Sequence, residues 1–375
     1  MKKLFLLVGL TMTTMVNVLA QTATKEFYMI VGTYTAKTSK GIYVYRFNPT
    51  TGKLQYASHV SGVKNPSFVA VSPTQEMVYS VGETDGDGTV NSFRFDRKQG
   101  VLSYLNSQSA GGPGSCHVTT DRTGKWVMVG NYGAGSLSIL PVEADGTLGK
   151  ATQTIQHTGN SVNKNRQEKP HVHSVNVAVN NTDVFVPDLG VDKVYTYKLD
   201  TQKGLLNPGK PAFTSSTPGS GPRHFVFSPN NKYAYVIEEL TATVTAYRYE
   251  KGALKPIQTI STVPSDYTGL KWDADIHVSA DGKFLYASNR AHESITVYAI
   301  DAKSGRLTWV DNTPVEGKTP RNFAIDPTGN YVLVANQDSD NITVFSRDKK
   351  TGKLKYTGYS IEVSMPVCLK FADAL

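Results

Sequence analysis

The sequence predicts an all-β protein, a seven-bladed β-propeller built from four-stranded antiparallel blades. Three observations predict it. A Gly-x-Leu tripeptide recurs seven times, strand-like segments separated by turn residues fill the intervals, and the two ends of the chain carry complementary parts of one blade.

The Gly-x-Leu repeat sets the number of blades. Its intervals are 48, 46, 58, 48, 53 and 47 residues, and repeats of about 50 residues are typical of propellers. In a closed array each unit packs on its neighbours, so 375 residues need not divide into several domains. The seven tripeptides begin at Gly52, Gly100, Gly146, Gly204, Gly252, Gly305 and Gly352.

One unit shows its strands clearly. Residues 224–229 form a first strand, a polar turn follows, and residues 233–238, 244–249 and 256–262 form the next three. The same order recurs from Phe68, Val118, Val172, Ile276 and Phe323, with turns such as residues 279–283 after the first strand. No stretch has the apolar period of a helix. We therefore expect meandering blades with the first strand innermost.

The two termini are expected to close the ring. Residues 27–54 supply the later strands of a unit that has no first strand, and residues 365–371 form a first strand with nothing after it. Pairing them in one sheet removes a free edge. Cys116 and Cys368 then lie on innermost strands two blades apart, too far for a disulfide, whose Cα atoms lie within about 7 Å.

The N-terminus resembles a secretory signal. Lys2 and Lys3 precede an apolar run, and small residues stand before Gln21, so we expect cleavage after Ala20 and export to the periplasm or medium. The domain organisation is then a signal peptide over 1–20 and one propeller over 21–375. The run is too short to span a bilayer, and no membrane insertion is expected after cleavage.

Composition excludes other classes of protein. The chain is 39% apolar with 32 Gly and 2 Cys, unlike a disordered chain or a disulfide scaffold. Its net charge of +8 falls to +6 when two lysines leave with the signal peptide, and the charge is scattered. A nucleic-acid partner is therefore not expected.

Ionisable residues recur where first strands begin and second strands end. Both positions face one mouth of the ring if the first strand is innermost. Arginines at one mouth would bind an anion through paired hydrogen bonds, and a His or Glu could move a proton. The residues singled out are His171, His173, Arg223, His224, Glu238, Glu239, His277, Asn289, Arg290 and Arg321.

Single members of this set have simpler explanations. Asn131, Asn289 and Asn336 recur at equivalent positions, which favours a scaffold role for them. His171 and His173 stand two apart on a strand, as metal ligands can, but other metal-binding motifs are absent. We expect neither a metal nor a cofactor.

Four paired motifs resemble the lactonase family of seven-bladed β-propellers, which includes propeller-type 6-phosphogluconolactonases and fungal carboxymuconate-lactonising enzymes. The motifs are residues 170–175 with 186–190, 221–225 with 237–240, 287–290 with 294–297, and 319–323 with 335–337, and the resemblance covers residues 27–371.

The resemblance implies metal-free acid–base chemistry by a His and a Glu, with arginines that bind an anion. The His falls on His171 or His173, the Glu on Glu239 or Glu238, and the arginines on Arg223 and Arg290; Arg321 is added by position. The implied activity is hydrolysis of a small anionic sugar lactone of the 6-phosphogluconolactone type.

Catalytic roles are assigned to His173, His171, Glu239 and Arg290, with His173 or Glu239 activating water. Substrate contacts are assigned to Arg223, His224, Glu238, His277, Arg321 and Asn289. Two alternatives stay open: muconate-type lactonising activity, and a non-catalytic propeller that binds a sugar acid. The signal peptide departs from the family expectation, because a phosphorylated lactone is made in the cytoplasm.

Overall fold

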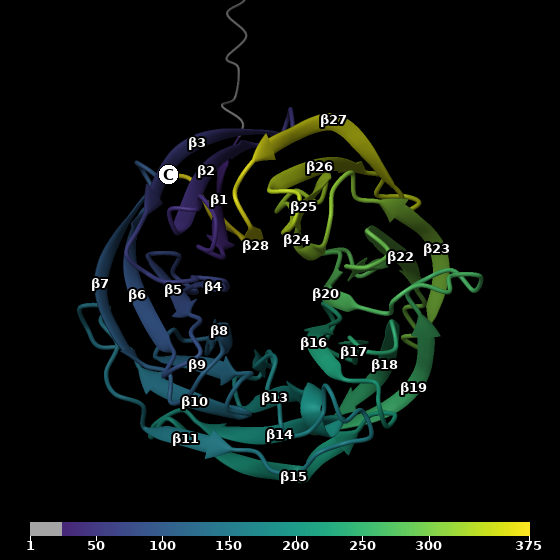
Figure 1. The fold of residues 1–375 in the computed structure, drawn as a ribbon, viewed down its shortest axis with the longest axis horizontal. Coiled ribbons are helices and arrows are strands. Elements are labelled where there is room, and N and C mark those ends of the chain that lie inside the picture. Colours follow the sequence, from purple (N-terminus) through teal and green to yellow (C-terminus); the bar gives the residue numbers. More distant parts are fainter. Residues whose placement is uncertain (1–24) are drawn as a thin grey trace, which may run out of the picture.

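Strands form where apolar and polar residues alternate between turns. The structure is a computed structural model that describes residues 25–375. Its strands form seven antiparallel four-stranded sheets arranged in a ring (Figure 1). The predicted fold class is confirmed, including the innermost place of each first strand. One short 3₁₀ helix, Leu189–Val191, follows a second strand.

The sheets are given from inner to outer strand. The first four are β28 (Pro366–Asp373), β1 (Phe27–Thr33), β2 (Ile42–Asn48), β3 (Lys53–Val60); β4 (Val69–Val71), β5 (Met77–Gly82), β6 (Thr89–Asp96), β7 (Val101–Ser109); β8 (Ser115–Thr120), β9 (Trp126–Asn131), β10 (Ser136–Pro141), β11 (Gln153–Gln156); and β12 (Asn176–Val177), β13 (Asp183–Asp188), β14 (Lys193–Asp200), β15 (Leu205–Ser215). The last three are β16 (Pro222–Phe227), β17 (Tyr233–Glu238), β18 (Thr243–Glu250), β19 (Ala253–Ser261); β20 (Asp273–Val278), β21 (Phe284–Asn289), β22 (Ser294–Ile300), β23 (Leu307–Pro314); and β24 (Pro320–Ile325), β25 (Tyr331–Asn336), β26 (Asn341–Arg347), β27 (Leu354–Glu362).

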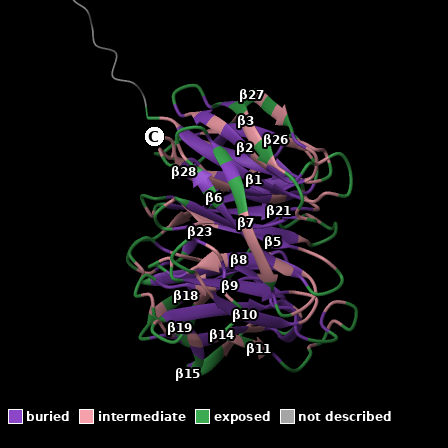
Figure 2. Ribbon diagram, turned by 90° about the vertical axis from the view of Figure 1, so that its left-hand side faces the viewer, coloured by how far each residue is buried: buried purple, intermediate pink, exposed green. Residues whose placement is uncertain are grey.

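The core lies between neighbouring sheets. Tyr235 and Ile237 of β17, for example, pack with Ile276 and Leu285 of the next sheet. Buried residues follow the inner strands, and exposed ones gather on the outermost strands and turns (Figure 2). Each sheet thus buries both faces against other sheets, as a ring requires.

The Gly-x-Leu repeat has a packing reason. Gly100 and Gly305 adopt φ of +70° and +73°, and a Cβ on either would overlap the ring of Tyr28 or Tyr233 in the adjacent blade. The leucine two residues on, such as Leu307, is buried. Each tripeptide therefore combines a left-handed turn with close contact between blades.

The termini close the ring as predicted. β1 pairs antiparallel with β28, with Phe27 opposite Asp373 and Gly32 opposite Cys368. Cys116 lies on β8 and Cys368 on β28, both free and buried. The predicted signal peptide falls outside the described residues. Within residues 25–375, no helix has the length and apolar character needed to cross a membrane.

One predicted strand is largely missing. The first strand expected from Val172 is reduced to Asn176–Val177, with an isolated bridge from Val172 to Asp188. Pro187, in the partner strand β13, has no amide hydrogen to donate, and the carboxylate of Asp188 binds the amide of His171 at 2.7 Å instead. The segment that carries His171 and His173 is consequently irregular.

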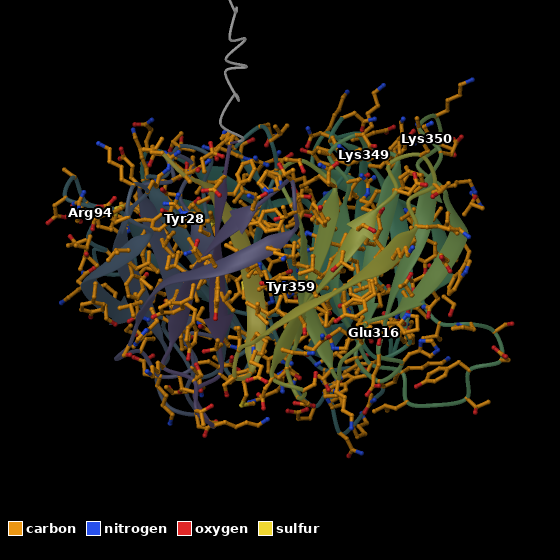
Figure 3. The ribbon with its side chains drawn as sticks, turned by 90° about the horizontal axis from the view of Figure 1, so that it is seen from above. Tyr28, Arg94, Glu316, Lys349, Lys350 and Tyr359 are labelled. Carbon is orange, nitrogen blue, oxygen red and sulfur yellow. The ribbon has the colours of Figure 1, made fainter. Side chains whose placement is uncertain are left out.

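The ring has two different faces. First strands begin and second strands end on one of them, which we call the site face. Glu316, just before β24, lies toward the site face, whereas Lys349 and Lys350, in the turn after β26, lie on the opposite face (Figure 3).

Candidate active site

The site face delivers side chains from several blades to one cleft. Arg223 and Arg321 each stand second in a first strand, while Glu239 and Arg290 directly follow the second strands β17 and β21. The cleft has a volume of about 230 Å³. It is lined by Glu83, Cys116, Tyr132, Arg166, His173, Glu239, Trp272, Arg290 and Arg321.

Glu239 is the centre of the charged network. Its Oε2 accepts hydrogen bonds from Nε of Arg223 at 2.9 Å and lies 2.7 Å from Nη2 of Arg290. Its Oε1 accepts from Nη2 of Arg166 at 2.5 Å. Charge-assisted contacts of this kind fix both partners in place. Glu239 therefore holds three guanidinium groups together: those of Arg166 and Arg290, which line the cleft, and that of Arg223, which does not.

This network decides the charge of its members. Burial alone would raise the pKa of Glu239, but Arg290, Arg223 and Arg166 outweigh burial and hold that pKa far below its usual value. Burial, with help from Arg223 and Arg321, lowers the pKa of Arg290 to about 9, so Arg290 stays charged at neutral pH. A carboxylate that holds its charge so firmly is a poor proton acceptor.

His173 stands beside this network as a neutral base. The ring is buried, lies edge-on to Tyr132 and to His224 with ring centroids 5.4 Å apart in each case, and has Cys116 Sγ at 3.8 Å from Nδ1. Burial and then the charge of Arg223 lower the pKa of His173 well below its usual value. The ring is therefore unprotonated at neutral pH, and one of its nitrogens carries a free lone pair.

Arg321 differs from the other arginines. Its guanidinium lies 5.6 Å from the centroid of the Tyr34 ring, and it makes no hydrogen bond or ion pair within residues 25–375. Arg290 instead donates to the carbonyl of Asp273 and stacks on Trp272 at 3.9 Å. The N–H donors of Arg321 thus have no acceptor in that part of the chain, and its side chain lines the cleft.

Two predicted residues turn away because neighbours on a strand point to opposite sides. Glu238 accepts hydrogen bonds from Thr243 at 2.6 Å and Thr245 at 3.1 Å, inside its blade. Asn289 donates to Ser294 at 3.2 Å and to Thr296 at 3.0 Å. Neither lines the cleft, so the structure does not bring them to the substrate position expected for them.

Two histidines also lie apart from the cleft lining. His171 stacks on the ring of Tyr132 with centroids 4.3 Å apart, and its Nε2 lies 3.2 Å from Oε1 of Glu168. His277 lies four residues along β20 from the site face, with its Nε2 at 2.9 Å from Asp275. Between residues 25 and 375 no three His, Cys, Asp or Glu side chains cluster as metal ligands would.

Sequence reasoning missed Arg166 and Trp272. Both lie in segments inserted between blades, Arg166 between β11 and β12 and Trp272 between β19 and β20. These insertions fall in the two longest intervals of the Gly-x-Leu repeat, 58 and 53 residues, which could have identified them. Asp192 anchors the first insertion through Ser161 at 2.5 Å and Gln167 at 2.8 Å.

The arrangement suits an anionic ligand with an apolar face. Four arginines and two carboxyl groups surround the cleft and the space next to it, so their formal charge is 4 − 2 = +2. They are Arg166, Arg223, Arg290 and Arg321, with Glu83 and Glu239. The rings of Tyr132 and Trp272 add flat apolar surface. A neutral imidazole beside free guanidinium donors can activate water and stabilise an oxyanion.

The chain is similar over most of its length to known proteins. The family model for seven-bladed β-propeller lactonases matches residues 28–371. The chain is 38% identical to a 6-phosphogluconolactonase of Bacillus subtilis, covering 91% of this chain and 97% of that one. It is 40% identical to a 6-phosphogluconolactonase of Formosa agariphila, covering 80% and 86% respectively. Among solved structures, a periplasmic gluconolactonase of Pseudomonas aeruginosa superposes with a TM-score of 0.88 at 35% identity, covering 93% of this chain and all of that one.

Proposed function

The chain belongs to the seven-bladed β-propeller lactonase family, and from that premise we propose that it hydrolyses a sugar lactone of the 6-phosphogluconolactone type in the cleft around Glu239. The relatives named above as 6-phosphogluconolactonases and as a gluconolactonase support this reaction. The observation that carries it is the surplus of two positive charges around a neutral histidine.

Substrate binding follows from the unpaired donors. Arg321, with no protein partner in residues 25–375, binds the negative group of the lactone, and the ring of the sugar lies between Tyr132 and Trp272. Arg290 and Arg166 keep donors beyond those that Glu239 occupies. Arg223 is held by Glu239 and by the carbonyl of Ala274 at 2.5 Å, so it serves chiefly to fix the wall.

Catalysis then needs one proton acceptor. As water attacks the lactone carbonyl, its proton passes to His173, and the guanidinium groups stabilise the oxyanion. The ring C–O bond breaks and its oxygen takes the proton back from His173. Of the two bases that the sequence left open, we assign this role to His173, because Arg166, Arg223 and Arg290 already occupy both carboxylate oxygens of Glu239.

Lactone opening in a pH-stat tests the proposal. The purified protein, His173→Gln and Arg290→Gln are compared on 6-phosphogluconolactone and on unphosphorylated gluconolactone. Arg94→Gln, on the outer surface, is the matched control (Figure 3). We expect both cleft variants to lose at least about 100-fold in kcat/KM while the control is unchanged. Equal rates in all four proteins reject the site, and no hydrolysis by the parent rejects the reaction.

We also propose that residues 1–20 direct export, leaving residues 21–375 as one propeller domain. The N-terminal sequence and the similarity to a protein named as a periplasmic gluconolactonase support this. N-terminal sequencing of the protein recovered from each cell fraction checks it. An exported protein that starts at Gln21 is expected, and an intact Met1 in the cytoplasm would contradict export.

A further inference from the structure

A second, smaller cavity lies beneath the cleft. It offers about 10 Å³ for the centre of a water molecule, which is roughly the space that one water needs. Glu83, Cys116, His173 and Arg321 line both spaces, so the small cavity adjoins the floor of the cleft. Tyr34, Ser67, Arg223 and His224 complete most of its wall.

His224 lines this cavity, and one of its two ring nitrogens has no hydrogen-bond partner between residues 25 and 375. Its Nδ1 is 2.7 Å from Oδ1 of Asp275, an ionised carboxylate, so Nδ1 donates the hydrogen and Nε2 keeps its lone pair. Nε2 makes no hydrogen bond to any residue from 25 to 375, and the ring lines the cavity.

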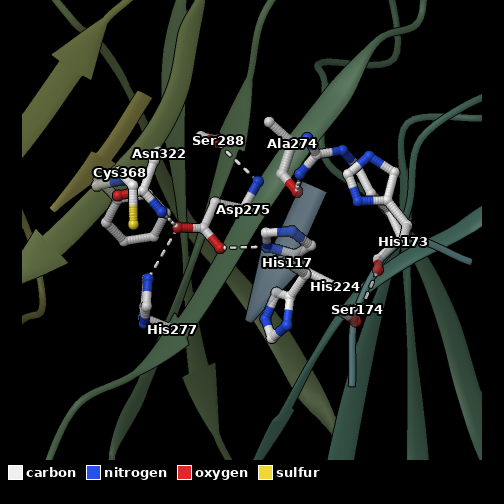
Figure 4. A network of polar contacts seen from close by, with 12 residues as sticks. His117, His173, Ser174, His224, Ala274, Asp275, His277, Ser288, Asn322 and Cys368 are labelled. Carbon is white, nitrogen blue, oxygen red and sulfur yellow. Dashed lines mark hydrogen bonds and ion pairs between the residues drawn. The ribbon is translucent and has the colours of Figure 1, made fainter. Parts of the chain in front are cut away.

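The rest of the network holds Asp275 in place. Its Oδ2 accepts from His277 at 2.9 Å and from Asn322 at 2.5 Å, and its amide donates to Ser288 Oγ at 2.9 Å. Figure 4 shows Asp275 in the middle of this group, with His173 and His277 at opposite ends. Such a network fixes one orientation of the His224 ring.

A second His–Asp pair in the molecule gives the contrast. His157 Nδ1 is also 2.7 Å from an aspartate oxygen, that of Asp188, and both groups are buried. Its Nε2, however, is 2.9 Å from the hydroxyl of Tyr197. That pair is satisfied entirely within the protein, whereas the pair of His224 and Asp275 has one acceptor left for something in the cavity.

We propose that the small cavity holds the water molecule that attacks the lactone, oriented by His224, and that Asp275 is the positioning residue that fixes the His224 ring. This inference rests on the proposed function. His173 and His224 both line the small cavity, so one water molecule held in it can contact both rings. One hydrogen of the water points to His224 Nε2 and the other to His173.

The water oxygen bonds to the carbonyl carbon, and the hydrogen that points to His173 moves to that ring. The second hydrogen stays on the oxygen and keeps its hydrogen bond to His224. When the ring C–O bond breaks, the leaving oxygen takes the proton from His173, and the product is a carboxylic acid and a hydroxyl group. Lone pairs of the water therefore face the cleft rather than the cavity wall, which is the orientation that attack needs.

Kinetics of three variants test the inference. We expect His224→Gln to lower kcat at least about tenfold with KM within about twofold, because the substrate groups are untouched. Asp275→Asn should also lower kcat. Its pH profile should change, because the substitution removes the carboxylate that contacts His224. The other charged or titratable groups that face His224 are Arg223, Lys370, His117 and His173. His157→Gln is the matched control and should keep the parent kcat.

A crystal structure of the parent gives a readout that is independent of activity and of variant folding. We expect an ordered water within about 3.2 Å of His224 Nε2. An empty cavity, or a protein group on Nε2, overturns the inference, as does His224→Gln with the same kcat as His157→Gln. If the parent opens no lactone, the proposed function and this inference fall together; if the parent is active and one of these other results appears, only the inference falls.

Discussion

Replacing Glu239 with glutamine tests whether one carboxylate holds the cleft together. Glu239→Gln leaves the shape but removes the negative charge that contacts Arg166, Arg223 and Arg290 at 2.5, 2.9 and 2.7 Å. Arg223 and Arg290 are almost wholly buried, so their charges would lie unpaired in the protein interior. Removing one partner of a buried ion pair costs about 3–5 kcal/mol of unfolding free energy.

This cost converts into a clear change of melting temperature. At about 2 °C per kcal/mol for a chain of this size, Glu239→Gln should melt about 6–10 °C below the parent by calorimetry or circular dichroism. Inorganic phosphate should recover part of the loss, because an anion can replace the missing carboxylate between the arginines. The same phosphate concentration should raise the melting temperature of the parent less.

Glu238→Gln is the control for this prediction. Glu238 is the neighbouring residue and equally buried, but its carboxyl group contacts the hydroxyls of Thr243 and Thr245 rather than arginines. We expect it to cost about 1 kcal/mol at most. Equal melting temperatures for the two variants, or a Glu239→Gln protein as stable as the parent, would refute the assignment of Glu239 as the organising charge.

Three further predictions follow from single contacts. Burial and then Arg223 lower the pKa of His224 to about 4, so the unfolded chain binds this proton more tightly than the folded protein does. The free energy of unfolding should therefore fall as pH drops from about 6.5 toward 4, by about 2 kcal/mol between pH 7 and 5. Urea titrations should show a smaller loss in His224→Gln. Arg321→Gln should raise KM about 10- to 100-fold for an anionic lactone but not for a neutral one, since a charge-assisted hydrogen bond contributes about 1.5–3 kcal/mol; equal changes for both substrates would contradict the role given to Arg321. Gly305 has φ +73°, and a Cβ there would overlap the ring of Tyr233, so Gly305→Ala should lower the unfolding free energy by about 1–3 kcal/mol. At Gly62 a Cβ would meet no atom within 4 Å, so Gly62→Ala has only the cost of its backbone conformation and should lower the unfolding free energy by less.

The fold could be predicted because its determinants are local and repeated. Each blade carries its own alternating strands, its turn residues and a Gly-x-Leu tripeptide that packs on the adjacent blade. Closure was also readable, because residues 365–371 lack partners of their own in the sequence. The first strand of the fourth blade escaped prediction, since Pro187 and the side chain of Asp188 change its backbone hydrogen bonds.

The candidate site was predictable only in part. Strand order placed Arg223, Glu239, Arg290, Arg321 and His173 at one face, and the structure brings them together. Strand alternation would have separated Glu239 from Glu238, and Arg290 from Asn289, had the exact strand ends been known. Arg166 and Trp272 lie on inserted segments without repeat, so nothing in their local sequence says where they fold back.

By itself, then, the sequence determined the ring, its number of blades, its closure and the face on which ionisable groups gather, because short-range alternation and a periodic packing contact specify them. Only the tertiary structure decided which of those groups form ion pairs with one another. Whether Glu239 can act as a base depends on the three arginines that contact it, one from an inserted segment and two from different blades. The second nitrogen of His157 is bound by Tyr197, whereas that of His224 has no partner among residues 25–375 and the residue lines a cavity; only the folded chain shows this difference.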